Sequence, residues 1–138
     1  MTKETFKISK DFLDECLKKY PNLGKNSHVG QLGILMVKEF FKRKYPGCKF
    51  EVNSSKIDLK VILLNGEIKK YEVKSTVDSG LAWSKLKVSS THCYNALQEG
   101  MPLVRITKIG EIEMDIYFLI CGIDFTLIPE PRYSVKKL

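Results

Sequence analysis

Several features that define large protein classes are missing from this sequence. No stretch approaches the roughly 18 apolar residues of a membrane-spanning helix, and the first ten residues hold no apolar secretion signal. The 4 cysteines are scattered without a CxxC pair, and the 2 histidines do not accompany paired cysteines. Neither a disulfide framework nor a zinc site is therefore indicated. We expect a soluble, cytoplasmic protein with no membrane partner.

Motifs of several common enzymes are also lacking. The glycine patterns of dinucleotide-binding and phosphate-binding loops do not occur, and neither does the GxSxG motif of serine hydrolases. What the chain has is 138 residues, 43% of them hydrophobic, which suits one domain with its own core. It carries 23 Lys and Arg against 16 Asp and Glu, a net charge of +7. This excess suits a polyanionic partner, although a solvated lysine-rich surface would give the same count.

The order of the expected elements indicates an α/β fold. Helices are predicted over 9–20, with Ser9 as its cap, from about Ser27 to Lys44, and over 89–99, capped by Ser89 or Ser90. Strands are predicted over 48–52, in a hairpin over 57–75, and over 85–88, 103–109, 111–121 and 125–128. We expect Gly30 and Gly33 to permit close packing of the second helix on a sheet. The prediction is a mixed β-sheet flanked by helices.

A β-hairpin over 57–75 is the most informative stretch. Apolar residues alternate along both halves, and Asn65-Gly66 is a strong turn signal. Asp58 begins the first strand, and the second strand ends in Glu72-Val73-Lys74. Because side chains alternate along a strand, Glu72 and Lys74 must share a face.

The length of the turn decides whether Asp58 joins that face. A two-residue Asn65-Gly66 loop would pair Asp58 with Val73, on the wrong face. A three-residue loop over 65–67 would pair Asp58 with Lys74 and Lys60 with Glu72, all on one side. A nuclease site therefore predicts a bulged turn or a bend elsewhere in the hairpin.

Such a cluster is suited to phosphodiester hydrolysis. One or two carboxylates hold Mg²⁺ or Mn²⁺ together with a substrate phosphate. Asp58 and Glu72 are the candidate ligands, with the Val73 backbone carbonyl as a third. Lys74 would orient the attacking water or offset charge on the phosphate. Acid-x-lysine occurs three times in the chain, however, so a strand edge with alternating charges is the structural alternative.

With these residues the sequence resembles the PD-(D/E)xK nuclease superfamily, and within it the restriction-endonuclease-like DUF3883 domains. The resemblance covers 29–106. Asp58 matches the acid of the first strand, and 71–75, YEVKS, matches an IEVKS segment. The segment 89–96 is similar to one in the second core helix. The resemblance implies a restriction-endonuclease-like core of order α-β-β-β-α-β and metal-dependent DNA cleavage by Asp58, Glu72 and Lys74. It divides the chain into a helical extension (1–26), a core (27–109) and a β-rich extension (110–138).

Two positions depart from the family pattern. Ile34 stands where the first helix usually carries a glutamate, and Gln31 is the geometric substitute as a metal ligand, ahead of Glu39. His92 stands where Glu or Gln is expected. It would either hydrogen-bond a phosphate or the lysine, or lie on the helix surface without a catalytic role. The alternative to an active nuclease is a catalytically degenerate DNA-binding module, or a subunit of a larger nucleic-acid-processing complex. A third possibility is a basic interaction protein with no nucleic-acid role.

Contacts to DNA, or to RNA, are expected from side chains next to the proposed site. The candidates are Ser75, Trp83, Lys85, Lys87, Ser89 and His92. Trp83 would stack on a base or, equally well, anchor a loop to the core. Ser89 and Ser90 are also explained as helix caps. A homodimer is a further possibility, with 112–119 as its interface or as an ordinary core strand.

Overall fold

A computed structural model describes all residues, 1–138. The helices are α1 (Lys10–Lys19), α2 (Asn26–Lys44) and α3 (Thr91–Gln98), with a short 3₁₀ helix, η1 (Trp83–Lys85). The strands are β1 (Thr2–Lys7), β2 (Lys49–Ser54), β3 (Ile57–Ile62), β4 (Ile68–Ser75), β5 (Leu103–Ile106) and β6 (Glu113–Leu119). None of the helices combines the length and apolar character that a membrane span requires.

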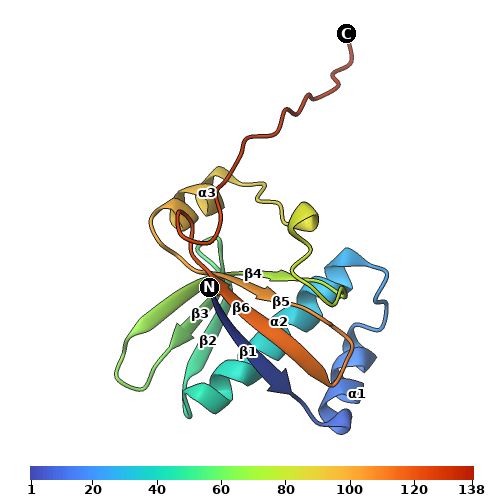
Figure 1. The fold of residues 1–138 in the computed structure, drawn as a ribbon, viewed down its shortest axis with the longest axis vertical. Coiled ribbons are helices and arrows are strands. Elements are labelled where there is room, and N and C mark those ends of the chain that lie inside the picture. The colour runs from blue at the N-terminus through green and yellow to red at the C-terminus, as the bar shows by residue number, and fades with distance from the viewer.

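The six strands form one mixed sheet in the order β1-β6-β5-β4-β3-β2. All neighbours are antiparallel except β4 and β5, which run parallel. A parallel pair needs a crossover connection, and here that connection contains η1 and α3. The predicted α/β class with a mixed sheet and flanking helices is confirmed (Figure 1).

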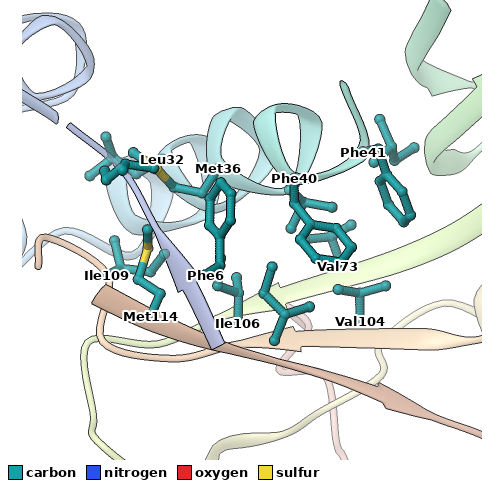
Figure 2. Close-up of a cluster of buried hydrophobic side chains, with 14 of the residues drawn as sticks. Phe6, Leu32, Met36, Phe40, Phe41, Val73, Val104, Ile106, Ile109 and Met114 are labelled. Atoms are coloured by element: carbon teal, nitrogen blue, oxygen red, sulfur yellow. The ribbon is translucent and has the colours of Figure 1, made fainter. Parts of the chain in front are cut away.

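One face of the sheet packs against α2. Side chains from alternate positions of β4, β5 and β6 point toward this helix, and Figure 2 shows Val73, Val104 and Ile106 beneath Phe40 and Phe41. Phe6 of β1 also enters this cluster, 5.7 Å from Phe40 between ring centroids. The core cluster contains 19 buried residues, so it is the main source of hydrophobic stabilisation.

The opposite face of the sheet is covered more thinly. Cys93 and Leu97 of α3 pack there against Leu103 and Leu119, in a separate cluster of 4 buried residues. The hairpin contributes the even-numbered positions of β3 and β4 to this face. They include Asp58, Lys60, Glu72 and Lys74, so one face of the hairpin is mostly apolar and the other carries most of the charged groups.

Close packing of α2 on the sheet depends on one glycine. A Cβ placed on Gly33 would lie 1.6 Å from Ser75 Oγ and 2.7 Å from Ser75 Cβ. Gly30, one turn earlier and exposed, would meet nothing within 4 Å. The expectation of close packing is therefore confirmed for Gly33 and wrong for Gly30.

The termini of several predicted elements need correction. The chain begins with β1, which pairs with β6, so 1–26 is not simply helical. The residues 85–88 form no strand, and 125–128 contribute only an isolated bridge between Phe125 and Cys121. Ser9 and Ser90 cap α1 and α3 as predicted, whereas α2 begins one residue before Ser27 without a side-chain cap.

The position of β6 bears on the predicted dimer interface. Because β6 pairs with β1 on one side and β5 on the other, its backbone offers no free edge to a second chain. Met114, Ile116 and Leu119 are buried in the chain's own interior. The 112–119 segment is therefore a core strand, which was the alternative to an interface.

The two glycines of α2 make a matched test of this packing. We expect Gly33→Ala to lower the free energy of unfolding by about 1–3 kcal/mol, because helix and strand must separate. Gly30→Ala should raise it by about 0.5–1 kcal/mol, because alanine favours the helix and space is free. Urea unfolding followed by circular dichroism measures both. Equal effects of the two substitutions would contradict the contact between Gly33 and Ser75.

Candidate active site

The turn between β3 and β4 fixes which residues can meet. Leu63 N–H donates to the Glu67 carbonyl at 2.9 Å, and Gly66 N–H donates to the Leu63 carbonyl at 2.9 Å. The loop therefore contains Leu64, Asn65 and Gly66, and Gly66 takes a φ of +87°. A three-residue loop was predicted, but one residue later in the chain.

Because the loop is shifted, the residue pairs between β3 and β4 differ from the predicted pairs, but each side chain stays on the predicted face of the hairpin. Leu59 pairs with Tyr71 and Lys60 with Lys70. By the same register Asp58 falls opposite Glu72, so the predicted pairings of Asp58 with Lys74 and of Lys60 with Glu72 are wrong. Asp58, Glu72 and Lys74 still lie on one face, because a shift of two residues leaves the alternation unchanged.

The β3–β4 hydrogen-bond ladder ends at Asp58, whose side chain takes the place of a backbone carbonyl as the acceptor. The last backbone pair of the ladder is Leu59 with Tyr71, and beyond it Asp58 Oδ2 accepts the Val73 N–H at 3.0 Å. The N–H and C=O of one strand residue point to the same side. The Val73 carbonyl is therefore directed toward the β3 side of β4, where Asp58 lies.

Glu72 is the carboxyl group of the site whose pKa is perturbed. It is 7% exposed, and Cys93 of α3 donates its thiol hydrogen to Glu72 Oε2. Burial, followed by hydrogen bonding with the Asp58 carboxyl group, raises the pKa of Glu72 from an ordinary 4.5 to about 7, against opposing effects of Cys93 and Lys74. A carboxyl group with a pKa near 7 carries its proton for a substantial part of the time at neutral pH.

Cys93 is a functional neighbour that the sequence did not reveal. Burial and then the adjacent Glu72 raise the pKa of Cys93 to about 12, so its sulfur is a neutral hydrogen-bond donor. From the sequence, Cys93 was considered for a disulfide or a zinc site, and no role beside Glu72 was predicted for it. The available signal was its position three residues after Ser90, whose Oγ accepts the Cys93 N–H at 3.0 Å and begins α3.

Arg105 is a second residue near the site that was not predicted from the sequence. It pairs with Lys74 across β4 and β5, and its side chain is almost fully buried at 2% exposure. Its Nε donates to the Leu81 carbonyl at 2.9 Å, while its Nη2 has no partner. Its burial lowers the pKa of Arg105, with a smaller opposing effect of Asp78. The guanidinium group of Arg105 is thus held against the 76–90 connection, while its backbone is the neighbour of Lys74 in the β4–β5 register.

The donor set limits which metal ion the site could hold. No cluster of three or more His, Cys, Asp or Glu side chains is arranged to hold a metal. This composition does not suit a structural zinc site, which requires about four protein ligands. It does suit Mg²⁺, which is commonly held by one or two carboxylates and completes its shell with water and substrate phosphate. Asp58, Glu72 and the Val73 carbonyl are the residues that would hold it.

Two predicted site residues, one a metal ligand and one a nucleic-acid contact, lie on the α2 side of the sheet, away from Glu72. Ser75 Oγ is buried beneath Gly33 of α2, on the face opposite to Glu72. Gln31 is exposed on that same helix. Neither side chain is brought to the carboxyl pair, so the expectations that Gln31 completes a metal shell and that Ser75 contacts DNA find no support in this arrangement.

The other predicted contact residues are distributed over the 76–90 connection and α3. Lys85 lies in η1 and pairs with Asp78 at 2.7 Å, and Lys87 pairs with Glu130, so both ammonium groups already have carboxylate partners. Their expected projection from a common strand is wrong. Trp83 is 46% exposed and lines a small, mostly apolar cavity of about 120 Å³.

The two remaining candidates lie on either side of the start of α3. Ser89 is exposed just before the helix, whereas Ser90 is the residue that caps it. His92 is exposed on α3, immediately before Cys93. Of the predicted nucleic-acid contacts, His92 is therefore the one next to a residue that touches Glu72.

Glu72 makes a prediction for stability that does not depend on catalysis. A carboxyl group with a raised pKa favours the folded state at low pH, and this contribution is lost as pH rises from about 4.5 through about 7. We expect the free energy of unfolding of the wild type to fall by about 2 kcal/mol relative to Glu72→Gln between pH 5 and pH 8. Urea unfolding at both pH values measures the difference. Parallel pH profiles would contradict the buried, proton-sharing environment of Glu72.

Comparison with known proteins assigns no family to this chain. No family model matches the sequence, no curated protein matches it, and no solved structure matches the fold. The chemistry of Asp58, Glu72 and Lys74 is therefore the basis for a functional assignment.

Proposed function

We propose that this chain is a metal-dependent nuclease that hydrolyses DNA phosphodiester bonds with Mg²⁺ or Mn²⁺. The observation that carries the proposal is the meeting of Asp58 and Glu72 on one face of a hairpin, with Lys74 one step further along that face. A charged strand edge would require no burial of its carboxyl groups. Here Glu72 is buried, accepts the Cys93 thiol hydrogen and has a raised pKa, to which the Asp58 carboxyl group contributes, an arrangement that favours a functional site.

The order of elements supports the same proposal. From α2 the chain runs through β2, β3 and β4, then α3 and β5. This is the helix, three strands, helix and strand order of the restriction-endonuclease-like core, and we infer that the chain has that fold. β1 and β6 would be additions that extend the sheet beyond β5.

Each residue has a distinct part in the proposed reaction. Asp58, Glu72 and the Val73 carbonyl bind the metal ion, which when bound offsets phosphate charge and lowers the pKa of a water molecule it holds. Lys74 orients the attacking water and stabilises the negative charge that develops on the phosphate oxygens. The water oxygen forms a bond to phosphorus and loses a proton to solvent, the bond from phosphorus to the leaving oxygen breaks, and that oxygen takes up a proton from solvent. Arg105, beside Lys74, adds positive charge on the same side of the site.

A second candidate is a nuclease fold that binds nucleic acid without cutting it. The observation in its favour is that Cys93 occupies one oxygen of Glu72, while Ile34 supplies no third acid from α2. The two candidates differ in one measurable property, which is metal-dependent cleavage lost on substitution of Lys74.

The direct test is cleavage by the purified protein of supercoiled plasmid, circular single-stranded DNA and short RNA, with Mg²⁺, Mn²⁺ or EDTA. We expect Lys74→Ala, Glu72→Gln and Asp58→Asn each to lower the rate by about 100-fold or more, because each removes a group that acts on the transition state. Lys49→Ala, on the exposed edge strand β2, is the charge-matched control and should cut normally. Cutting that persists in Lys74→Ala would indicate another enzyme. No cutting of any substrate would favour the binding module.

Cys93 should set the pH at which this site becomes active. Its thiol hydrogen bond favours ionised Glu72, and metal binding requires that ionised form. We expect Mg²⁺ binding by the wild type to strengthen as pH rises through about 7. Cys93→Ala, which loses the donor, should shift this midpoint upward, whereas Cys93→Ser should shift it less. Calorimetric titration with Mg²⁺ between pH 6 and pH 8.5 is the measurement, and coincident midpoints of the two variants would rule out the donor role.

A further inference from the structure

A polar groove lies between α3 and the β3–β4 hairpin. Its volume is about 790 Å³, within the range of sites that hold small ligands. Lys60 and Lys70 of the hairpin line one side, and His92 and Asn95 of α3 line the other. The nuclease proposal does not use this groove.

The positions of Lys60 and Lys70 favour the binding of an anion. Lys60 and Lys70 are directly opposite each other in the β3–β4 register, and like charges in this arrangement destabilise a sheet. Lys60 is only 14% exposed, and its nearest carboxylate oxygen, on Glu51, is 3.9 Å away. Lys70 is exposed and forms no ion pair within 4.0 Å. An anion between the two ammonium groups would remove their repulsion.

The α3 side of the groove supplies further polar groups. His92 and Asn95 are both exposed, and neither side chain has a hydrogen-bond partner within the protein. The one acid in the groove, Glu99, follows the last turn of α3, seven residues from His92. At about 1.5 Å per residue this places it roughly 10 Å away along the helix axis. Glu99 is therefore separated from His92 along the groove.

The groove begins beside the proposed catalytic residues. Lys60 is two residues from Asp58 along β3, and Lys70 is two residues from Glu72 along β4, which is about 6.6 Å in each case. This distance is comparable with the separation of neighbouring phosphates in an extended nucleic-acid strand. A phosphate at Asp58 and Glu72 would thus have its neighbour between the two lysines.

The depth of the site selects the form of the nucleic acid. Glu72 is nearly buried under α3 at 7% exposure, so the reacting phosphate has to enter between the helix and the hairpin. A positively charged groove that follows one phosphate backbone is the usual way in which proteins bind a single strand. A single strand can enter it, with the apolar side chains of Ile68 and Met101 beside its sugars and bases.

We propose that this groove binds a single-stranded segment of nucleic acid, with Lys60 and Lys70 holding the phosphate next to the one that reacts. The proposal rests on the proposed function in taking Asp58, Glu72 and Lys74 as the place of reaction. It replaces Lys85 and Lys87 as the expected phosphate contacts, because those lysines are already paired with Asp78 and Glu130.

The test is equilibrium binding without cleavage. Fluorescence anisotropy of labelled oligo-dT, oligo-rU and a duplex of equal length is followed in EDTA over a range of salt concentrations. The wild type should bind the single strands more tightly than the duplex. Each of Lys70→Ala and Lys60→Met should weaken binding and lower the slope of log K against log salt by about 0.7, the value for one phosphate contact on a single strand. The oligo-dT and oligo-rU arms show which sugar is preferred.

Lys69→Ala is the matched control, because Lys69 is adjacent to Lys70 on β4 but points to the opposite face and pairs with Glu67 at 3.6 Å. It should bind like the wild type. The Lys60 side chain is largely buried, so Lys60→Met can fail to fold. Lys70→Ala tests the same groove at an exposed position, where the substitution does not disturb the fold. Wild-type affinity and salt slope in Lys70→Ala and in a folded Lys60→Met would overturn the proposal, and so would tighter binding of the duplex through the same lysines.

A parallel cleavage assay separates this inference from the nuclease proposal. Single-strand binding that needs Lys60 and Lys70, without cleavage of any substrate, would support the groove and reject the nuclease. Cleavage that needs Lys74 but is indifferent to Lys60 and Lys70, in binding and in rate, would support the nuclease and reject the groove.

Discussion

The alternation of side chains along β4 is the constraint on which the rest of the structure depends. Tyr71, Val73 and Ser75 point toward α2, so Glu72 and Lys74 must point toward α3. The apolar set is fixed by close packing, since Gly33 lets α2 approach the backbone at Ser75. A slip of one residue would bury Lys74 against the aromatic core and expose Tyr71. The hydrophobic face therefore holds the charged face in register, and the position of the site follows from the packing behind it.

Burial of Glu72 works against stability and in favour of chemistry. Removing a carboxylate from water is unfavourable, and the chain reduces that penalty by protonation, by the thiol of Cys93 and by the nearby charge of Lys74. The backbone N–H of Val73 meanwhile fixes one oxygen of Asp58. Glu72, with its raised pKa, is thus held on the same face as Asp58, where binding of a divalent cation would compete with its proton. A purely structural role would be met more simply by apolar residues of similar size.

The parts of the fold that were predictable are those set by local chemistry. The alternating pattern and the turn residues predicted the hairpin, and serine caps marked the starts of α1 and α3. Asp58, Glu72 and Lys74 were expected on one face, and they lie there. The exact register was not predictable, because Asn65 and Gly66 fit loops that begin at either of two positions. β1 was missed because its short, charged sequence becomes a strand only by pairing with β6, which is distant in the chain.

The charges on the α3 face explain why a basic chain concentrates function there. Lys60 and Lys70 are paired across β3 and β4, and Lys74 lies further along β4, where its charge opposes the rise in the pKa of Glu72. Because burial raises that pKa to about 7, Glu72 neutralises less of this positive charge at neutral pH than an exposed carboxylate would. The proposed nuclease would use both properties of this face, since phosphodiester hydrolysis requires a polyanion and a divalent cation in the same place.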